Sequence, residues 1–164
     1  MQRALLPLLA AGLLVASAAG AKAADTPQDK ANYLSYQGTW KIADKGTVYP
    51  AGFPKIENHV ITVAIDAGKK LKYTDNWDIG GQPGSSAFDG AWDDKPYPTS
   101  DGHMTSYKRV SARSYADHWT DDKGTAGEDH CTFTADGAHM NCTGSVTPKG
   151  GKKASYKEHW DKVQ

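Results

Sequence analysis

The sequence predicts an all-β protein, an antiparallel up-and-down β-barrel of eight to nine strands. Short runs of alternating apolar and polar residues recur along the chain, and turn residues separate them at intervals of about 8 to 12 residues. No segment of useful length repeats its apolar residues at the helical spacing. Because the connections are short, each strand is expected to pair with its neighbour in the sequence, so the sheet closes on itself as a meander.

The first 23 residues have the pattern of an export signal. A positive start with Arg3 precedes an uncharged, Ala/Leu-rich run over 4–20, and Ala21-Lys22-Ala23 has the small-x-small form of a cleavage site. We expect 1–23 to be a signal peptide, 24–35 an N-terminal segment and 36–164 one barrel domain. The mature protein is then periplasmic or secreted, and no later segment is apolar for long enough to span a membrane as a helix.

The charge balance argues against a polyanionic partner. Removing Arg3 and Lys22 lowers the count of Lys and Arg from 19 to 17 against 19 Asp and Glu, which leaves a net charge of about −2. Nucleic acid is therefore not an expected partner, and the small basic cluster over 149–153 predicts a solvated turn. The sequence does not indicate a protein partner.

The candidate strands are separated by clear turn chemistry. Gly80-Gly81-Gln82-Pro83-Gly84 is one such break, 93–102 with its two prolines is another, and 121–124 is a third. In chain order the predicted strands cover 38–43, 58–65, 70–79, 86–92, 103–110, 114–120, 128–134, 139–147 and 152–160.

Cys131 and Cys142 are the only two cysteines, and an exported chain meets an oxidising compartment. A hairpin that turns at Asp136-Gly137 places the two cysteines directly opposite each other. A disulfide between neighbouring strands is therefore predicted, with a free reactive thiol or a Cys-based metal site as the alternative.

A pattern Tyr-x-(Asp/Glu)-x-Trp occurs three times, over 73–77, 115–119 and 156–160. The period of two along a strand puts both rings and the acid of each copy on one face of the sheet. On 70–79 that face also holds Leu71 and Ile79, so it is predicted to point inward. The acids then either line a pocket for a cationic or polar molecule or lie at the wet mouth of a barrel, and the pattern leaves both open.

The cost of burial limits what these acids can do. A carboxylate without a partner in a dry interior costs several kcal/mol, which is comparable with the stability of a small domain. Asp75, Asp117 and Glu158 must therefore be hydrated, paired, protonated or matched by a bound cation. Arg109 is predicted to share the inward face of its strand with Tyr107 and to lie diagonal to Asp117.

The same alternation predicts the register of the following strand. Trp92 is predicted to face inward, and if Tyr73 lies opposite Trp92, Gly90 lies opposite Asp75 and leaves room beside its carboxylate. Core filling is the alternative explanation for each Trp, because the chain is poor in other large apolar side chains.

Several short motifs, taken in order, resemble those of a known family. Gly38-Thr39-Trp40 has the Gly-x-Trp form of the lipocalins and the wider calycin group. A closer likeness, over about 36–164, is to small exported bacterial lipocalin-like domains of unassigned function. The motifs that carry it are Gly38-Thr39-Trp40-Lys41, the Tyr-Pro and Pro-Lys pairs within 49–55, Tyr97-Pro98, Lys108-Arg109 and Asp136-Gly137.

The resemblance implies a lipocalin-like barrel with an internal cavity and the carriage of a small molecule. It assigns Gly38 and Trp40 a structural role and implies no catalytic residue. In the lipocalin pattern an Arg on a late strand covers this Trp. The last strand here offers Lys157, so that feature is either missing or supplied by Arg109.

Neither a metal site nor an enzyme is predicted. The His-Met pairs at 103–104 and 139–140 are adjacent on strands, so their side chains point to opposite faces, and His118 and His159 meet only if their strands are neighbours. No nucleophile elbow, phosphate loop or His-Glu-x-x-His motif is present. We therefore expect no catalytic residue, no metal and no cofactor.

The leading hypothesis is an exported barrel that binds a small amphiphilic or cationic molecule. The alternative is a filled barrel that acts as a protein-interaction module or inhibitor and holds no internal ligand. The candidate ligand-binding residues are Tyr73, Asp75, Trp77, Trp92, Tyr107, Arg109, Tyr115, Asp117, Trp119, Tyr156, Glu158 and Trp160.

Overall fold

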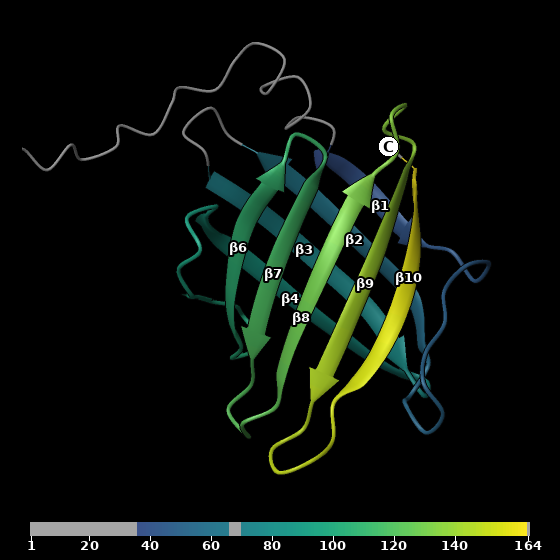
Figure 1. Cartoon of the computed structure of the whole chain (residues 1–164), viewed down its shortest axis with the longest axis vertical. Coiled ribbons are helices and arrows are strands. Elements are labelled where there is room, and N and C mark those ends of the chain that lie inside the picture. Colours follow the sequence, from purple (N-terminus) through teal and green to yellow (C-terminus); the bar gives the residue numbers. More distant parts are fainter. Residues whose placement is uncertain (1–35, 66–69, 164) are drawn as a thin grey trace, which may run out of the picture.

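A computed structural model describes residues 36–65 and 70–163, so the predicted signal peptide and N-terminal segment lie outside the described residues. The described residues form one antiparallel sheet of ten strands, with the order β4-β3-β2-β1-β10-β9-β8-β7-β6-β5 (Figure 1). Within these ranges no helix has the length and apolar character needed to cross a membrane. The strands are β1 (Gly38–Ile42), β2 (Ile56–Ile65), β3 (Lys70–Ile79), β4 (Gln82–Ala91), β5 (Tyr97–Pro98), β6 (Met104–Ser111), β7 (Ser114–Thr120), β8 (Ala126–Phe133), β9 (His139–Thr147) and β10 (Ala154–Lys162).

The sheet curls into a nearly closed barrel. Strands β1 to β4 form one wall and cross behind β6 to β10, which form the other (Figure 1). The two walls join on one side where β1 pairs with β10. On the other side β5 pairs with β6, Phe88 of β4 forms a single bridge with Thr99, and the backbone N–H of Ser100 donates to the carbonyl of Ala87 at 2.9 Å.

The prediction of an all-β antiparallel barrel is confirmed, but the strand count is ten rather than eight to nine. Strands β3, β7 and β9 have the predicted bounds. The missed strand is β5, whose two residues lie inside the predicted loop 93–102. Two residues are too few to show alternation, so no periodic signal marks this strand.

The predicted register between β3 and β4 is wrong. Tyr73 lies opposite Phe88 and Asp75 opposite Ser86, whereas Trp92 follows the end of β4. The cause is the turn, which uses only Gly80 and Gly81, with φ of 60° and 79°. Positive φ at both central residues is the geometry of the tightest β-hairpins, so pairing resumes at once and the rest of the predicted turn belongs to β4.

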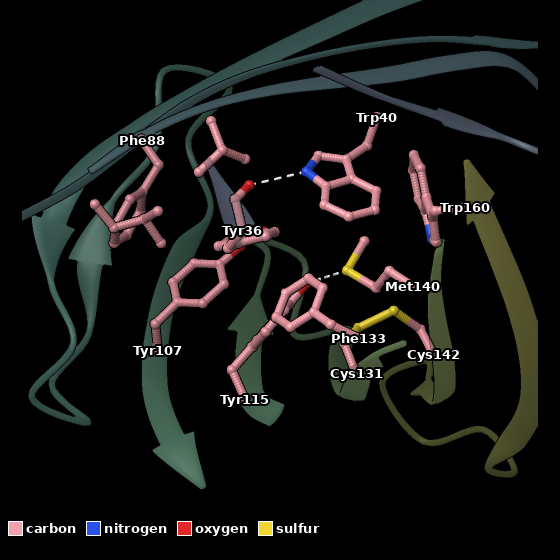
Figure 2. Close-up of a cluster of buried hydrophobic side chains, with 12 residues drawn as sticks. Tyr36, Trp40, Phe88, Tyr107, Tyr115, Cys131, Phe133, Met140, Cys142 and Trp160 are labelled. Carbon is pink, nitrogen blue, oxygen red and sulfur yellow. Dashed lines mark hydrogen bonds between the residues drawn. A yellow bond between two sulfur atoms is a disulfide. The ribbon is translucent and has the colours of Figure 1, made fainter. Parts of the chain in front are cut away.

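One end of the barrel is filled by a cluster of buried side chains around Trp40, which is fully buried. The Nε1–H of Trp40 donates to the carbonyl of Tyr36 at 2.8 Å, and the hydroxyl of Tyr115 donates to the sulfur of Met140 at 3.6 Å (Figure 2). The cluster contains Tyr36, Trp40, Val63, Leu71, Phe88, Tyr107, Tyr115, Cys131, Phe133, Met140, Cys142 and Trp160.

The cation that covers Trp40 is neither Lys157 nor Arg109. Strand β10 continues two residues beyond its predicted end and brings Lys162 opposite Trp40 in register. The Nζ atom of Lys162 lies 5.2 Å from the centroid of the indole. A cation over a Trp face at this distance is an attractive contact. Lys162 therefore occupies the place that the resemblance assigns to an arginine.

The predicted disulfide is confirmed. Cys131 of β8 and Cys142 of β9 are direct partners in register, and their Cα atoms lie 4.1 Å apart. Both cysteines are buried in the cluster described above. The bond therefore holds together two strands that are already neighbours.

Replacing both Cys131 and Cys142 by alanine is expected to lower the free energy of unfolding by about 2–3 kcal/mol. The bond closes a loop with a sequence separation of 11, and its loss increases the entropy of the unfolded chain. Urea unfolding of the oxidised wild type and of the double variant measures the difference. Equal unfolding midpoints would show that the bond does not contribute to stability.

Candidate functional site

A cavity of about 320 Å³ lies inside the barrel. One side of it is formed by members of the buried cluster, among them Tyr36, Tyr115 and Trp160. Tyr49 and Phe53, from the connection between β1 and β2, also line it, and their rings stack with centroids 5.6 Å apart. The lumen is therefore not solidly filled, and this connection is part of the cavity wall.

All three copies of the repeated motif line this cavity. Strands β3 and β7 run in the same direction along the barrel and β10 runs against them, as the alternating antiparallel order requires. Trp160 consequently points to the filled end and is 2% exposed, whereas Trp77 and Trp119 are half-buried at the other end. In each copy the acid lies between the two rings along the strand, and Asp75, Asp117 and Glu158 all line the cavity.

Glycines on the neighbouring strands leave room for the rings of the motifs. Gly84 lies opposite Trp77 and Gly127 opposite Trp119, and a Cβ atom at either glycine would overlap the indole. Each indole therefore lies flat against the backbone of the next strand. This arrangement keeps the two large rings along the wall and leaves the lumen open.

A fourth carboxylate, absent from the predicted site, joins the three acids. Asp129 of β8 lies directly opposite Asp117 of β7 and also lines the cavity. The next residue across the sheet is Gly144, and a side chain there would overlap both Asp129 and Tyr156. The sequence did contain a signal for this acid, because Asp129 alternates with the inward residues Cys131 and Phe133. Asp129 was missed because it belongs to no copy of the repeated motif.

Tyrosine and tryptophan side chains bind two of the four acids. The hydroxyl of Tyr156 donates to Oδ2 of Asp129 at 2.9 Å. The hydroxyl of Tyr49 donates to Oε1 of Glu158 at 2.8 Å, and the Nε1–H of Trp160 donates to Oε2 at 3.3 Å. Oδ1 of Asp129 is buried and has no hydrogen-bond partner among the described residues.

His59 is the base closest to these acids. Its Nε2 lies 2.7 Å from Oδ1 of Asp75, but the ring N–H does not point along this line, so both atoms are buried without an aligned hydrogen bond. A register shift between Glu57 and Val60, with Asn58 at φ 51°, precedes the regular pairing of β2. His59 was also missed, although it alternates with the inward residue Ile61 on the same strand.

Acids outnumber bases around the cavity. Asp101 brings the number of lining carboxyl groups to five, and the only basic side chains among the described lining residues are His59 and His103. Asp117 is 8% exposed and has no hydrogen-bond or ion-pair partner in the described ranges. The cavity is therefore rich in acceptors and poor in positive charge.

Burial changes the protonation of these acids. The pKa of Asp117 is raised well above its ordinary value, first by burial and then by the nearby charges of Asp129 and Glu158. Burial and the charge of Glu158 raise the pKa of Asp129 to about 7. Burial also raises the pKa of Glu158. These shifts favour the protonated, uncharged form of the three carboxyl groups.

Two of the predicted ligand-binding residues do not line the cavity. Trp92 packs at the filled end against Tyr36, Tyr107 and Tyr115, with ring centroids 5.6–5.8 Å apart. Arg109 lies beside a register shift at the end of β6, and its Nε–H donates to the carbonyl of Ser111 at 3.2 Å. The expected pairing of Arg109 with Asp117 is therefore wrong.

The remaining predicted residues, which come from β3, β6, β7 and β10, are brought together around one space. They are Tyr73, Asp75, Trp77, Tyr107, Tyr115, Asp117, Trp119, Tyr156, Glu158 and Trp160.

Comparisons with known proteins give only remote likenesses, and these are to solved structures. No family model matches the chain, and no curated protein matches it. The crystal structure of apo lipid binding protein 8 of Caenorhabditis elegans aligns with a TM-score of 0.45 and 9% sequence identity, covering 78% of this chain and 95% of that chain. A likeness this remote carries no argument about what this chain binds.

Proposed function

We propose that this protein is an exported binding barrel without enzymatic activity, and that its cavity holds a small amphiphilic molecule with a cationic group. The apolar part would contact the aromatic wall, and the cationic group would lie among Asp75, Asp117, Asp129 and Glu158. The pattern of the first 23 residues and the disulfide between Cys131 and Cys142 support export.

One observation carries this proposal, namely an open cavity in which the carboxyl groups of Asp117 and Asp129 are not fully partnered. Oδ1 of Asp129 has no hydrogen bond, and the Asp117 carboxyl has neither a hydrogen bond nor an ion pair among the described residues. Because a buried carboxyl group that lacks partners is costly, a cavity for a neutral apolar molecule gains nothing from Asp117 and Asp129. A cation entering this space replaces the missing partners.

The aromatic wall supports the same class of ligand. Faces of Trp and Tyr attract organic ammonium groups, and a nearby carboxylate adds to the attraction. Trp77, Trp119 and Tyr156 line the half of the cavity that lies away from the filled end. The volume of about 320 Å³ is at the lower end of the range for ligand pockets, so a small molecule is expected.

The geometry does not favour the alternative of a filled interaction module. That alternative requires side chains to occupy the lumen, whereas the filled region is limited to the cluster at one end.

Adding a primary alkylammonium salt below its micelle concentration is expected to change the intrinsic Trp fluorescence in a saturable way. The alcohol of the same chain length should bind at least about tenfold more weakly, because it offers no charge to the acids. The test compares titrations of both compounds against folded protein. No change with either compound would remove the proposed function.

Variants locate the binding within the cavity. Asp117→Asn and Asp129→Asn should each weaken the binding of the ammonium compound at least about tenfold. Both variants should leave the weak binding of the alcohol unchanged. Asp122→Asn, in the exposed turn between β7 and β8, is the matched control and should have no effect. Equal affinity of wild type and both cavity variants would show that the acids do not select the ligand.

A further inference from the structure

The outer surface of β9 and β10 carries a polar cluster that the cavity does not use. His139 is the register partner of Asp161, and Asn141 is the register partner of His159. The intervening residues of these strands, such as Met140 and Trp160, belong to the buried cluster, so the four polar side chains lie on the opposite, outer face. These two neighbouring strands form one edge of the front wall in Figure 1.

The sequence did not predict this cluster. His118 and His159, which could meet only on neighbouring strands, do not meet, because β7 and β10 are not neighbours in the sheet. Instead the pairing of β9 with β10 stacks the rings of His139 and His159, with centroids 5.3 Å apart and an interplanar angle of 25°.

Potential ligand atoms converge in this cluster. Nδ1 of His139 lies 2.7 Å from Oδ1 of Asp161, and Nε2 of His159 lies 3.5 Å from the same oxygen. One such atom from each of the three residues lies within 4.8 Å of the other two. Two imidazole nitrogens and one carboxylate oxygen form a ligand set that zinc and its neighbours in the first transition row accept.

We propose that His139, His159 and Asp161 form a surface site for one divalent transition-metal ion of the zinc class. A solvent molecule would complete the coordination, since these side chains remain 27–49% exposed. The ion would lie between the two imidazole rings and the carboxylate of Asp161. There it would replace the hydrogen bond that now joins His139 to Asp161.

Asn141 supports this assignment beyond the three ligands. Its Oδ1 lies 2.7 Å from Nδ1 of His159, and an amide oxygen there accepts the proton of Nδ1. The lone pair of the ring is then on Nε2, the atom that faces Asp161. Histidines that bind metals usually have this kind of support on their other nitrogen, and losing it typically weakens metal binding about 10- to 100-fold.

The backbone around His159 is held in place from a second side. Its N–H donates to Oγ1 of Thr47 at 3.0 Å, and its carbonyl accepts from the N–H of Ala43 at 2.8 Å. Gly46, at φ 96°, lets this loop pass so closely that an added Cβ atom would lie 3.1 Å from Cβ of His159. A fixed strand pair and a fixed loop reduce the ordering that metal binding requires.

Zinc chloride is the probe for this site, added to protein that has no polyhistidine tag and has been dialysed against a chelator. Competition with a chromophoric zinc indicator is expected to show one bound ion per chain. His159→Ala and Asp161→Asn should each lower the affinity at least about tenfold, and Asn141→Ala about tenfold. Millimolar magnesium should not compete, because it prefers a shell of oxygen ligands.

His118 provides the matched control. It lies on the outer face of β7, with its Nδ1 4.0 Å from Glu128, but no second histidine accompanies it in that pair. His118→Ala should keep the full zinc affinity. Absence of zinc binding to folded wild type, or equal losses in His118→Ala and His159→Ala, would overturn the proposal.

A second readout does not depend on the folding of any variant. Cobalt(II) is paramagnetic and follows the ligand preferences of zinc, so it should broaden the amide NMR signals of residues near the site. Selective broadening around 139–141 and 159–161 in the wild type would support the site. Broadening that centres elsewhere, for example on His103 or His130, would contradict it.

Discussion

Replacing Trp40 by alanine is expected to lower the free energy of unfolding by about 3–5 kcal/mol, a large part of the stability of a domain of this size. Trp40 is fully buried at the filled end of the barrel, and its ring contacts Phe133 with centroids 5.6 Å apart. The substitution leaves a cavity, removes the hydrogen bond to the Tyr36 carbonyl and removes the ring that Lys162 covers. Urea unfolding followed by far-UV circular dichroism measures the loss.

Two further variants separate the causes. Trp40→Phe keeps most of the buried volume but loses the donor, so the carbonyl of Tyr36 is left without its partner and a smaller loss of about 1–3 kcal/mol is expected. Val110→Ala removes an exposed side chain and should change stability by less than about 0.5 kcal/mol. A loss in Trp40→Ala no greater than that of Val110→Ala would show that Trp40 does not anchor the filled end.

Asp129→Asn is expected to stabilise the protein above neutral pH by about 2–4 kcal/mol. The pKa of Asp129 is about 7 in the folded protein, against an ordinary value of 3.8. Between these values the folded state holds a proton that the unfolded state has released, so the wild type loses stability as pH rises from about 4 to about 7. Each pKa unit corresponds to about 1.4 kcal/mol. Asparagine does not ionise and avoids this loss.

Unfolding experiments at several pH values measure the effect. The wild-type curve should fall between pH 4 and pH 8, and the Asp129→Asn curve should fall less. Asparagine can still accept the hydrogen bond from Tyr156, so the comparison isolates the charge. The exposed acid Asp122 serves again as the control, and Asp122→Asn should follow the wild-type slope. A variant slope equal to that of the wild type would contradict the assignment of the raised pKa to Asp129.

The sequence predicted the strands that alternate strictly and that end in unambiguous turns. Strand β3 is an example, because its inward residues Tyr73, Asp75 and Trp77 all line the cavity and its bounds match the prediction. The same period of two placed the acids of the other motif copies on the inner face. Alternation within one strand was sufficient to predict the inward face wherever one face is apolar and aromatic and the other is charged.

Features that depend on the pairing of two strands could not be predicted from alternation within one strand. Five consecutive turn residues from Gly80 to Gly84 allowed several hairpins, and only the structure shows that two of them form the turn. Arg109 is still the register partner of Tyr115, but it lies at the end of β6, outside the cavity, and alternation does not reveal how far along the barrel a residue lies. The pairing of His139 with Asp161 depends on the register of β9 against β10 rather than on any local pattern.

The closure between β4 and β6 has a consequence for motion. Among the described residues, every other neighbouring pair of strands is joined by a ladder of three or more residue pairs. At this junction β5 pairs with β6 through two residues, and β4 is joined to the segment after β5 by one bridge at Phe88, two hydrogen bonds between Ser100 and Ala87 and one between Ser86 and Asp101. Few hydrogen bonds need to break for the wall to part there, so the free energy of local opening should be lowest at this seam. The barrel would then open locally at its side, and a bound molecule could enter or leave through this opening without unfolding of the opposite wall.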